Sequence, residues 1–366
     1  IRTIATTIEE GFSLPKVEKF EELINERTKA ILICNPNNPT GYLYTRREMN
    51  QIRDLVKKYD LFLFSDEVYR EFIYTGSPYI SACHLEGIEN NVVLIDSVSK
   101  RYSECGIRIG ALITKNKEIR DAVMKFCQAR LSPPLIGQIA AEASLDAPEE
   151  YSRETYDEYV ERRKCLIDGL NRIPGVYSPI PMGAFYTVAK LPVDDSDKFC
   201  AWCLSDFEYE GQTVFMAPAS GFYTTPGAGR NEVRIAYVLK KEDLNRALFV
   251  LKKALEGFAL TAAAGAGARV ISSLLNFFLN KKLVFKTNAD TGKTLLRYYC
   301  LAVPQMLLQI LLTDGAYVLF HVKPTGVLHT LIYMVVMILL YIIGYMIQQR
   351  WVFAPQKQNE PEVEKK

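Results

Sequence analysis

A lysine and an arginine stand close together in the segment SVSKRYSECGIRIG (97–110). Lys100 follows Ser97 and Ser99, and Arg108 comes eight residues after the lysine. A charged surface loop would explain these residues. They would equally suit an active site in which the lysine amine bonds a carbonyl carbon and the arginine holds an anion. The second interpretation requires further polar groups nearby.

Two other segments supply such groups, and each follows an apolar run. NPNNPTG (35–41) comes after the first run and Asp66 after the second, as Lys100 comes after the third. The carboxyl ends of the strands in an open α/β sheet lie along one crevice, where ligands bind. We therefore expect the three polar segments to converge. The apolar runs are 29–35, 61–65 and 92–96.

An internal lysine commonly forms a Schiff base with the cofactor pyridoxal 5'-phosphate. Such a site needs an acid that keeps the ring nitrogen protonated and donors that hold the phenolic oxygen of the ring. Hydroxyl and cationic groups must hold the phosphate, and a planar cation, which favours arginine, should bind the substrate carboxylate. The sequence offers a candidate for each of these needs.

The pattern of the first 258 residues predicts an α/β fold. Thr45 and Glu48 form a capping box before a helix over 46–59. Short apolar runs that alternate with helices argue for parallel strands joined by crossovers, and 111–114 is expected to be a fourth strand. Helices are expected next at about 117–129 and 150–172. The pattern then changes to strands at 184–191 and 232–239 with helices near 195–208 and 241–257, which predicts a smaller α+β domain.

Three of these motifs resemble fold-type-I pyridoxal-phosphate aminotransferases, and more narrowly the class I/II group that includes aspartate aminotransferases. The motifs are NPTG (38–41), the spacing of Asp66 and Tyr69, and S-x-S-K with its following arginine. GAFY (183–186) and VRIAY around Arg234 match in the same order. The resemblance covers residues 1–258, with a remnant of the major domain at about 1–150 and the small domain at about 151–258.

The resemblance implies a role for each matching residue. Lys100 would form the internal Schiff base and then move the proton between the substrate α-carbon and the cofactor. Asp66 would pair with the pyridinium nitrogen, and Arg234 would bind the α-carboxylate of the amino acid. The phenolic oxygen is assigned to Tyr69 and Asn38, and the phosphate to Ser97, Ser99 and Arg108.

The implied activity is transfer of an amino group from an amino acid to a 2-oxo acid, with aspartate and 2-oxoglutarate as the first expectation. C–S lyases and decarboxylases of the same fold share these motifs and are alternatives. The family usually forms homodimers with shared sites. It normally has a long N-terminal part with no counterpart here, so we expect a fragment that binds the cofactor weakly or not at all.

The composition changes sharply near residue 259, and long apolar runs dominate the rest. Residues 327–347 carry no Lys, Arg, Asp or Glu over about the length that crosses a bilayer. A globular core helix rarely runs so long without a charge. Further candidate spans lie at 295–320 and 262–280, and a polar tail follows at 355–366. We expect a multi-pass membrane part.

An internal repeat supports this expectation. Residues 273–285, SLLNFFLNKKLVF, resemble 341–353, YIIGYMIQQRWVF, at an offset of 68 residues. The segment 262–354 resembles the GtrA family of small membrane proteins, which has two similar halves and is associated with polyprenyl-linked sugars for surface polysaccharides. Two chance amphipathic interface segments are the alternative explanation.

Positive charge sets the expected orientation. Basic clusters between the first two candidate spans and after the third place both regions in the cytosol. An odd number of spans would then leave the enzyme part outside, so we expect a missing first span and a cytoplasmic enzyme part. Joined fragments of two neighbouring genes are the preferred origin, and a natural fusion is the alternative. The alternative function is a membrane protein carrying an inactive aminotransferase remnant.

Whole-chain composition bounds the remaining classes. The 366 residues have a formal net charge of +2, so no nucleic-acid partner is expected. Cys200 and Cys203 form a C-x-x-C with no second pair or nearby His, which makes a poor zinc site, and no metal is expected. The eight scattered cysteines fit a reducing, cytosolic setting for the soluble part.

Overall fold

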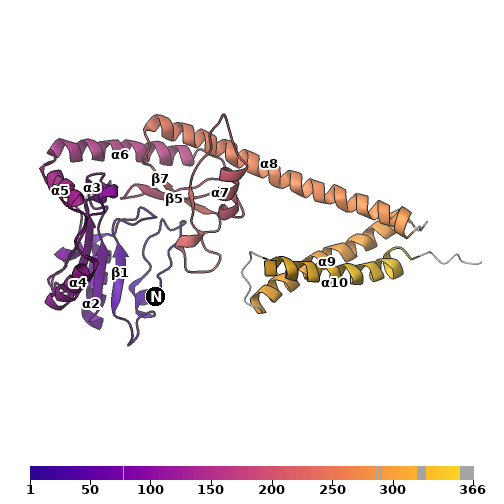
Figure 1. The fold of residues 1–366 in the computed structure, drawn as a ribbon, viewed down its shortest axis with the longest axis horizontal. Coiled ribbons are helices and arrows are strands. Elements are labelled where there is room, and N and C mark those ends of the chain that lie inside the picture. Colours follow the sequence, from indigo (N-terminus) through magenta and orange to yellow (C-terminus); the bar gives the residue numbers. More distant parts are fainter. Residues whose placement is uncertain (77, 286, 288–289, 320–326, 355–366) are drawn as a thin grey trace, which may run out of the picture. The chain divides into compact units, whose positions relative to one another are not determined.

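The computed structural model describes residues 1–76, 78–285, 287, 290–319 and 327–354 (Figure 1). The chain forms two compact units, Ile1–Leu260 and Thr261–Lys366. The first unit contains two β-sheets with their helices, and the described part of the second is helical.

The larger sheet of the first unit has four strands in the order β1-β2-β3-β4. β1 (Ala30–Cys34), β2 (Phe62–Asp66) and β3 (Val92–Ser97) are parallel to one another. The register pairs Cys34 with Asp66, so the carboxyl ends of β1 and β2 lie side by side. The strand ends that carry the polar segments therefore share one edge of the sheet, as expected for parallel strands.

Helix α2 (Arg46–Tyr59) covers part of this sheet because one of its faces is apolar. Met49, Ile52 and Val56 pack in one buried cluster with Leu63 of β2. The predicted capping box is present: the Thr45 hydroxyl accepts a bond from the Glu48 N–H, and the Glu48 carboxylate accepts one from the Thr45 N–H. The helix has the bounds that the sequence predicted.

The fourth strand departs from the expected pattern. β4 (Gly110–Ile113) pairs with β3 but runs antiparallel to it. A parallel return needs a crossover that carries the chain back along the sheet, usually a full helix. The connection contains α3 (Val98–Arg101) and the 3-10 turn Cys105–Ile107, which are too short for this, so the chain reverses direction.

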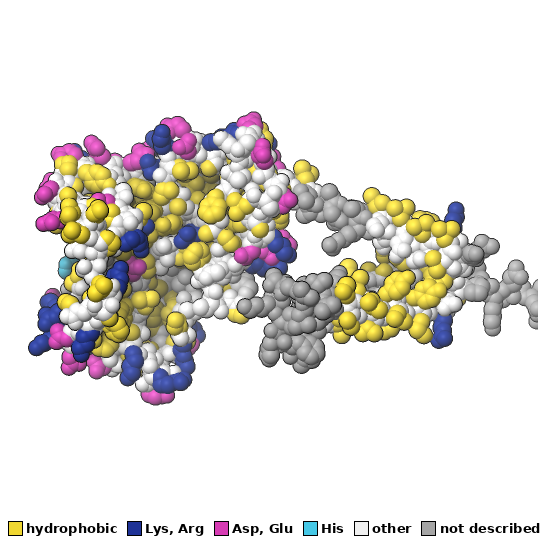
Figure 2. Space-filling model, viewed as in Figure 1, with side chains coloured by type: hydrophobic (Ala, Val, Ile, Leu, Met, Phe, Trp, Pro, Cys, Tyr) yellow, Lys and Arg dark blue, Asp and Glu magenta, His cyan; other side chains and the backbone are white. Residues whose placement is uncertain are grey.

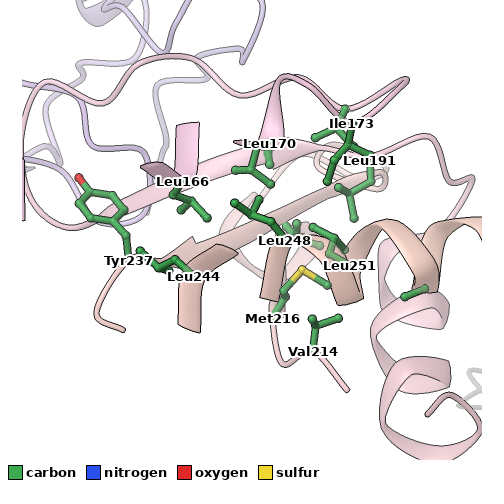
Figure 3. Close-up of a cluster of buried hydrophobic side chains, with 14 of the residues drawn as sticks. Leu166, Leu170, Ile173, Leu191, Val214, Met216, Tyr237, Leu244, Leu248 and Leu251 are labelled. Atoms are coloured by element: carbon green, nitrogen blue, oxygen red, sulfur yellow. The ribbon is translucent and has the colours of Figure 1, made fainter. Parts of the chain in front are cut away.

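The smaller sheet contains β5 (Tyr186–Lys190), β7 (Glu232–Ala236) and β6 (Ala217–Pro218) in that order, all antiparallel. Two helices pack against each other beside it, α6 (Glu149–Leu170) and the first part of α8 (Lys241–Leu279). Figure 3 shows their leucines pointing toward one another in the core of this part of the unit. The labelled leucines of these helices are Leu166, Leu170, Leu244, Leu248 and Leu251.

Four further helices complete the first unit: α1 (Val17–Glu21), α4 (Lys117–Arg130), α5 (Leu135–Ala143) and α7 (Ser196–Ser205). The sequence analysis did not identify α5. Helix α8 is longer than the predicted 241–257, because the alanine-rich sequence after residue 258 contains no proline and favours the helix.

The second unit contains the end of α8, α9 (Thr291–Leu319) and α10 (Val327–Ile347). Figure 2 shows hydrophobic side chains over the surface of α9 and α10. Among the described residues, one helical segment, Met334–Val352, is long and apolar enough to cross a membrane. The candidate spans 262–280 and 295–320 overlap α8 and α9, and some of their side chains lie outside the described residues.

The two repeated segments meet at equivalent positions in the second unit. Each ends in a π-helical turn, Asn280–Val284 in the first and Gln348–Val352 in the second. The Asn280 side-chain amide donates a hydrogen bond of 3.4 Å to Gln348 Oε1, a residue 68 positions later. The Phe285 and Phe353 rings, also 68 positions apart, stack with centroids 4.7 Å apart. The repeat in the sequence is therefore a paired feature of the structure.

Candidate active site

Asp66 is the last residue of β2 and is partly buried. Its Oδ1 accepts a hydrogen bond of 3.2 Å from the Val68 N–H. Burial raises the pKa of Asp66; the bond from Val68 opposes this rise, and the nearby charge of Asp96 adds to it. A cation placed beside Asp66 would restore its ionised form.

The amine of Lys100 faces two aromatic rings. Lys100 lies in α3, which begins directly after β3 because the Ser97 hydroxyl caps it by accepting the Ser99 N–H. The Lys100 Nζ lies 5.9 Å from the ring centroid of Tyr69 and 5.8 Å from that of Phe185. Tyr69 follows β2 and is buried, so the lysine and the end of β2 come together across one ring.

Arg234 contacts a second pair of aromatic rings. Its guanidinium carbon is 4.9 Å from the Tyr186 ring centroid and 5.1 Å from that of Phe222. Its Nη1 donates a hydrogen bond of 3.3 Å to Asn38 Oδ1, which belongs to the loop after β1. The Tyr69 and Tyr186 ring centroids are 5.8 Å apart, which joins the arginine to the lysine through two rings.

Two glycines allow the loop after β1 to touch the GAFY segment. Gly41 has a φ of +70°, and a Cβ there would lie 2.3 Å from Pro181 Cβ and 2.9 Å from the Tyr186 carbonyl oxygen. A Cβ on Gly183 would lie 2.6 Å from Pro36 Cβ. The Gly41 carbonyl accepts hydrogen bonds from the N–H groups of residues 182 and 183. Only glycine permits this close approach.

Two tyrosine hydroxyls fix the backbone just before the aromatic residues Phe185 and Tyr186. Tyr74 and Tyr237 both donate to the carbonyl oxygen of Ala184, at 2.7 and 3.0 Å. Ala184 is fully buried and has a φ of +57°, which is uncommon for a residue with a side chain. The following residues, Phe185 and Tyr186, provide the rings that face the lysine and the arginine.

The residues assigned to the phosphate are only partly brought together. The Ser97 hydroxyl lies 2.7 Å from that of Ser99 and also bonds the carbonyl oxygen of Ile109. Arg108 is exposed, and its Nη1 donates to the Cys105 carbonyl at 2.9 Å. Among the described residues no hydrogen bond joins Arg108 to either serine. The serines therefore lie beside Lys100, whereas the arginine bonds its own turn.

Several residues of this arrangement were missing from the sequence-based site. Phe185 and Tyr186 belong to the GAFY motif, which could have identified them as part of the site, although a motif match gives no direction for a ring. Asp96 and Arg101 flank the serine–lysine segment and engage in ion pairs described below. A cavity of about 840 Å³ lies elsewhere, between the N-terminal segment and β1.

The donor set fits pyridoxal phosphate. A primary amine, a carboxylate at a neighbouring strand end and two adjacent serine hydroxyls lie near aromatic rings that pack edge to face, and an arginine has donors that can bind a carboxylate. An amine can bond an aldehyde, a carboxylate can hold a protonated ring nitrogen, and hydroxyls can bind a phosphate. This set of groups, positioned by a parallel-rich sheet, is typical of enzymes that depend on this cofactor.

Residues 1–251 match the model of the family described as aminotransferase class I and II, and the chain belongs to that family. Residues 246–353 match the family described as GtrA/DPMS, transmembrane domain. Both resemblances drawn from the sequence are therefore confirmed, as is the α/β fold with a helical C-terminal part. Pyridoxal phosphate is the cofactor of the aminotransferase family, and the GtrA match with the apolar helix indicates membrane association.

Curated relatives and solved structures agree with this family. An aspartate aminotransferase of Rhizobium meliloti is 30% identical over 260 residues, which cover 67% of this chain and 60% of the relative. An aspartate aminotransferase of Thermotoga maritima is 33% identical and covers 68% and 61%. The structure of an aromatic aminotransferase from Pyrococcus horikoshii has a TM-score of 0.62 at 28% identity and covers 70% and 67%. The chain thus spans about three fifths of the length of these curated relatives.

Proposed function

We propose that residues 1–258 carry out pyridoxal-phosphate-dependent transamination, in which an amino group passes from an amino acid to a 2-oxo acid. The observation that carries this proposal is the single cluster in which Lys100 contacts Tyr69, Arg234 contacts Tyr186, and the two tyrosine rings contact each other. A transaminase needs a reactive amine close to a cation that binds a carboxylate.

When bound, pyridoxal phosphate supplies an aldehyde carbon for the amine and a ring that accepts electrons from the substrate α-carbon. Lys100 would hold this carbon through its Nζ and would move the proton at the substrate α-carbon. Asp66 would pair with the protonated ring nitrogen, and that positive charge would favour the ionised form of Asp66. Ser97 and Ser99 would hold the phosphate with their hydroxyls, and Arg108 would add its charge there if its side chain left the Cys105 carbonyl.

Arg234 binds the substrate α-carboxylate. A guanidinium has five N–H donors in a planar fork, and Arg234 gives one to Asn38, so donors remain for a carboxylate. The rings of Tyr186 and Phe222 beside it restrict where the fork can lie. Asn38 and Tyr69 are assigned to the phenolic oxygen, and Asn38 also orients the arginine.

We assign aspartate and 2-oxoglutarate as the first substrate pair to test. The support is the identity of about three residues in ten to relatives named aspartate aminotransferases. Similar structures also include proteins named aromatic and alanine aminotransferases, so these amino acids belong in the same assay. A homodimer is the proposed assembly, because the family usually forms one.

We assign residues 262–354 to a multi-pass membrane domain that handles lipid-linked sugars of surface polysaccharides, with the enzyme part in the cytoplasm. The support is the GtrA/DPMS match, the apolar segment Met334–Val352 and the paired repeat of the second unit. Protease protection of the full chain in sealed membrane vesicles would test the orientation.

The test of the enzyme function uses the full chain in detergent with added pyridoxal phosphate. We expect a visible absorbance band that shifts on adding an amino acid and is absent in Lys100→Ala. Lys198→Ala, an exposed lysine on α7, should retain the band and serves as the control. Absence of the band in the wild type would favour an inactive remnant, and release of thiol without amino transfer would favour a C–S lyase.

A further inference from the structure

We propose that four charged residues, one in α3 and three in the neighbouring segments, position the amine of Lys100 at the site. They are Arg70, Glu71, Asp96 and Arg101, here called the Asp96 ion cluster. This inference deepens the proposed function and rests on it for its catalytic meaning. Its geometry, however, can be tested without the cofactor.

Asp96 is the centre of the cluster. Its Oδ2 lies 2.8 Å from Arg70 Nη2 and 3.2 Å from Arg101 Nη2, and its side chain is 14% exposed. The other oxygen, Oδ1, is buried and accepts no hydrogen bond among the described residues. The two arginines therefore supply most of what compensates this buried carboxylate, and removing either one is costly.

A second acid closes the cluster. Glu71 Oε1 lies 3.1 Å from Arg101 Nε and 3.6 Å from Arg70 Nε. Each arginine thus bridges the same two carboxylates, and the four charges sum to zero. The arginine side chains are 23% and 26% exposed, so the pairs are less screened by water than ordinary surface ion pairs.

The cluster links two elements of the site. Arg101 is the residue after Lys100 in α3, and Arg70 is the residue after Tyr69, whose ring faces the lysine amine. Helix α3 has four residues and none of them is buried, so apolar packing does little to fix its position. The pairing of Arg101 with Glu71 therefore helps to hold α3 against the turn after β2.

The cluster also acts on the charge beside the cofactor site. The Asp96 charge contributes to the raised pKa of Asp66, and the two arginines offset that charge. Loss of one arginine would leave Asp96 less compensated and would disfavour ionised Asp66. Both arginines pair with Glu71 and Asp96, and they affect Lys100 only through these two acids. We therefore call them positioning residues.

The first experiment measures the accessibility of Lys100 in the cofactor-free full chain in detergent. A small amine-acylating reagent is added, and the acylation rate of Lys100 is followed by peptide mass spectrometry. We expect Arg101→Met and Asp96→Asn to raise this rate about two- to tenfold, because the members of an ion network are energetically coupled and the loss of one loosens the others. Arg101→Lys, which keeps one charge but not the two-pronged geometry, should be intermediate.

Arg53→Met is the matched control. Arg53 also pairs with an acid, its neighbour Asp54, but on helix α2 away from the lysine. The acylation rate of Lys100 in Arg53→Met should equal that in the wild type. Circular dichroism should show that all variants are folded. If Arg101→Met does not fold, Glu71→Gln, at the more exposed end of the cluster, should give a smaller change in the same direction.

The second experiment adds pyridoxal phosphate and titrates the absorbance band with pH. We expect its midpoint to move in Arg101→Met and Asp96→Asn and to return toward the wild type in Arg101→Lys. Folded variants whose Lys100 acylation rate equals that of the wild type would overturn the positioning role. A wild type without the band, but with the expected acylation rates, would refute the proposed function and leave the positioning role standing.

Discussion

The contact between the loop after β1 and the GAFY segment makes a quantitative prediction about Gly41→Ala. The new methyl group would require alanine at a φ of +70°, which costs about 1–2 kcal/mol. It would also meet Pro181 Cβ at 2.3 Å and the Tyr186 carbonyl oxygen at 2.9 Å. Overpacking of this kind costs about 1–3 kcal/mol, because a backbone oxygen cannot rotate away. We therefore expect a loss of roughly 2–5 kcal/mol in the free energy of unfolding of the first unit.

Substitutions at two further glycines separate the backbone cost from the steric cost. Gly227 has a φ of +80°, and no atom of the described residues lies within 4 Å of the position that a methyl group would take there. Gly227→Ala should therefore show the backbone cost alone, about 1–2 kcal/mol. Gly183 is not among the residues with positive φ, but its Cβ would lie 2.6 Å from Pro36 Cβ. Gly183→Ala should show the steric cost alone, about 1–3 kcal/mol.

The assay is denaturant unfolding of the full chain in detergent, followed by the fluorescence of Trp202 in a Trp351→Phe background. Trp202 packs against the core of the first unit, and Trp351 lies in the second, so the signal reports the unit of interest. The change should appear in the midpoint without a change in slope. If Gly41→Ala is no less stable than Gly227→Ala, the close approach inferred for the two loops is wrong.

Four other outcomes follow from the same contacts. Asn38→Ala removes the acceptor that orients Arg234 and a side chain assigned to the phenolic oxygen, so KM for the amino acid should rise about two- to tenfold and kcat should fall as well, measured by steady-state kinetics. Thr45→Ala removes the cap of α2 and should lower the free energy of unfolding by about 1 kcal/mol in the same denaturant assay. Burial raises the pKa of Asp66, so the cofactor-free folded state binds the proton of this carboxyl group more tightly than the unfolded chain does. The free energy of unfolding should therefore fall as pH rises from the ordinary carboxyl pKa through the raised pKa. Asp66→Asn should abolish this part of the pH dependence in thermal melts. Burial also raises the pKa of Cys203 to about 12, so a maleimide should leave this thiol unmodified in the folded protein and label it after unfolding, and rapid labelling of the native protein would contradict its place in the core.

Local patterns carried reliable information about elements and their ends. The capping box at Thr45 and Glu48 placed the start of α2, because both partners lie within one turn of the chain. The apolar runs placed β1, β2 and β3 within one or two residues, and so placed Asp66 and Lys100 at strand ends. The 68-residue repeat could likewise be read directly from residue types.

Partners across long separations could not be read in this way. The direction of β4 depends on how far a short connection can travel, which residue types alone do not give. The hydrogen bond between Asn38 and Arg234 joins residues 196 positions apart, and no local pattern pairs them. Arg108 itself has a left-handed backbone with a φ of +61°, and its side chain bonds back to the Cys105 carbonyl, which residue types alone do not predict.

The sequence by itself determined which residues could do chemistry and which strands would carry them, since hydrophobic period, capping and motif spacing act over a few residues. The tertiary structure alone decided which of those residues meet. It set the contacts of Lys100 and Arg234 with aromatic rings and the ion cluster at Asp96. Such contacts depend on how two sheets and their loops pack, and this packing forms only when the whole unit folds.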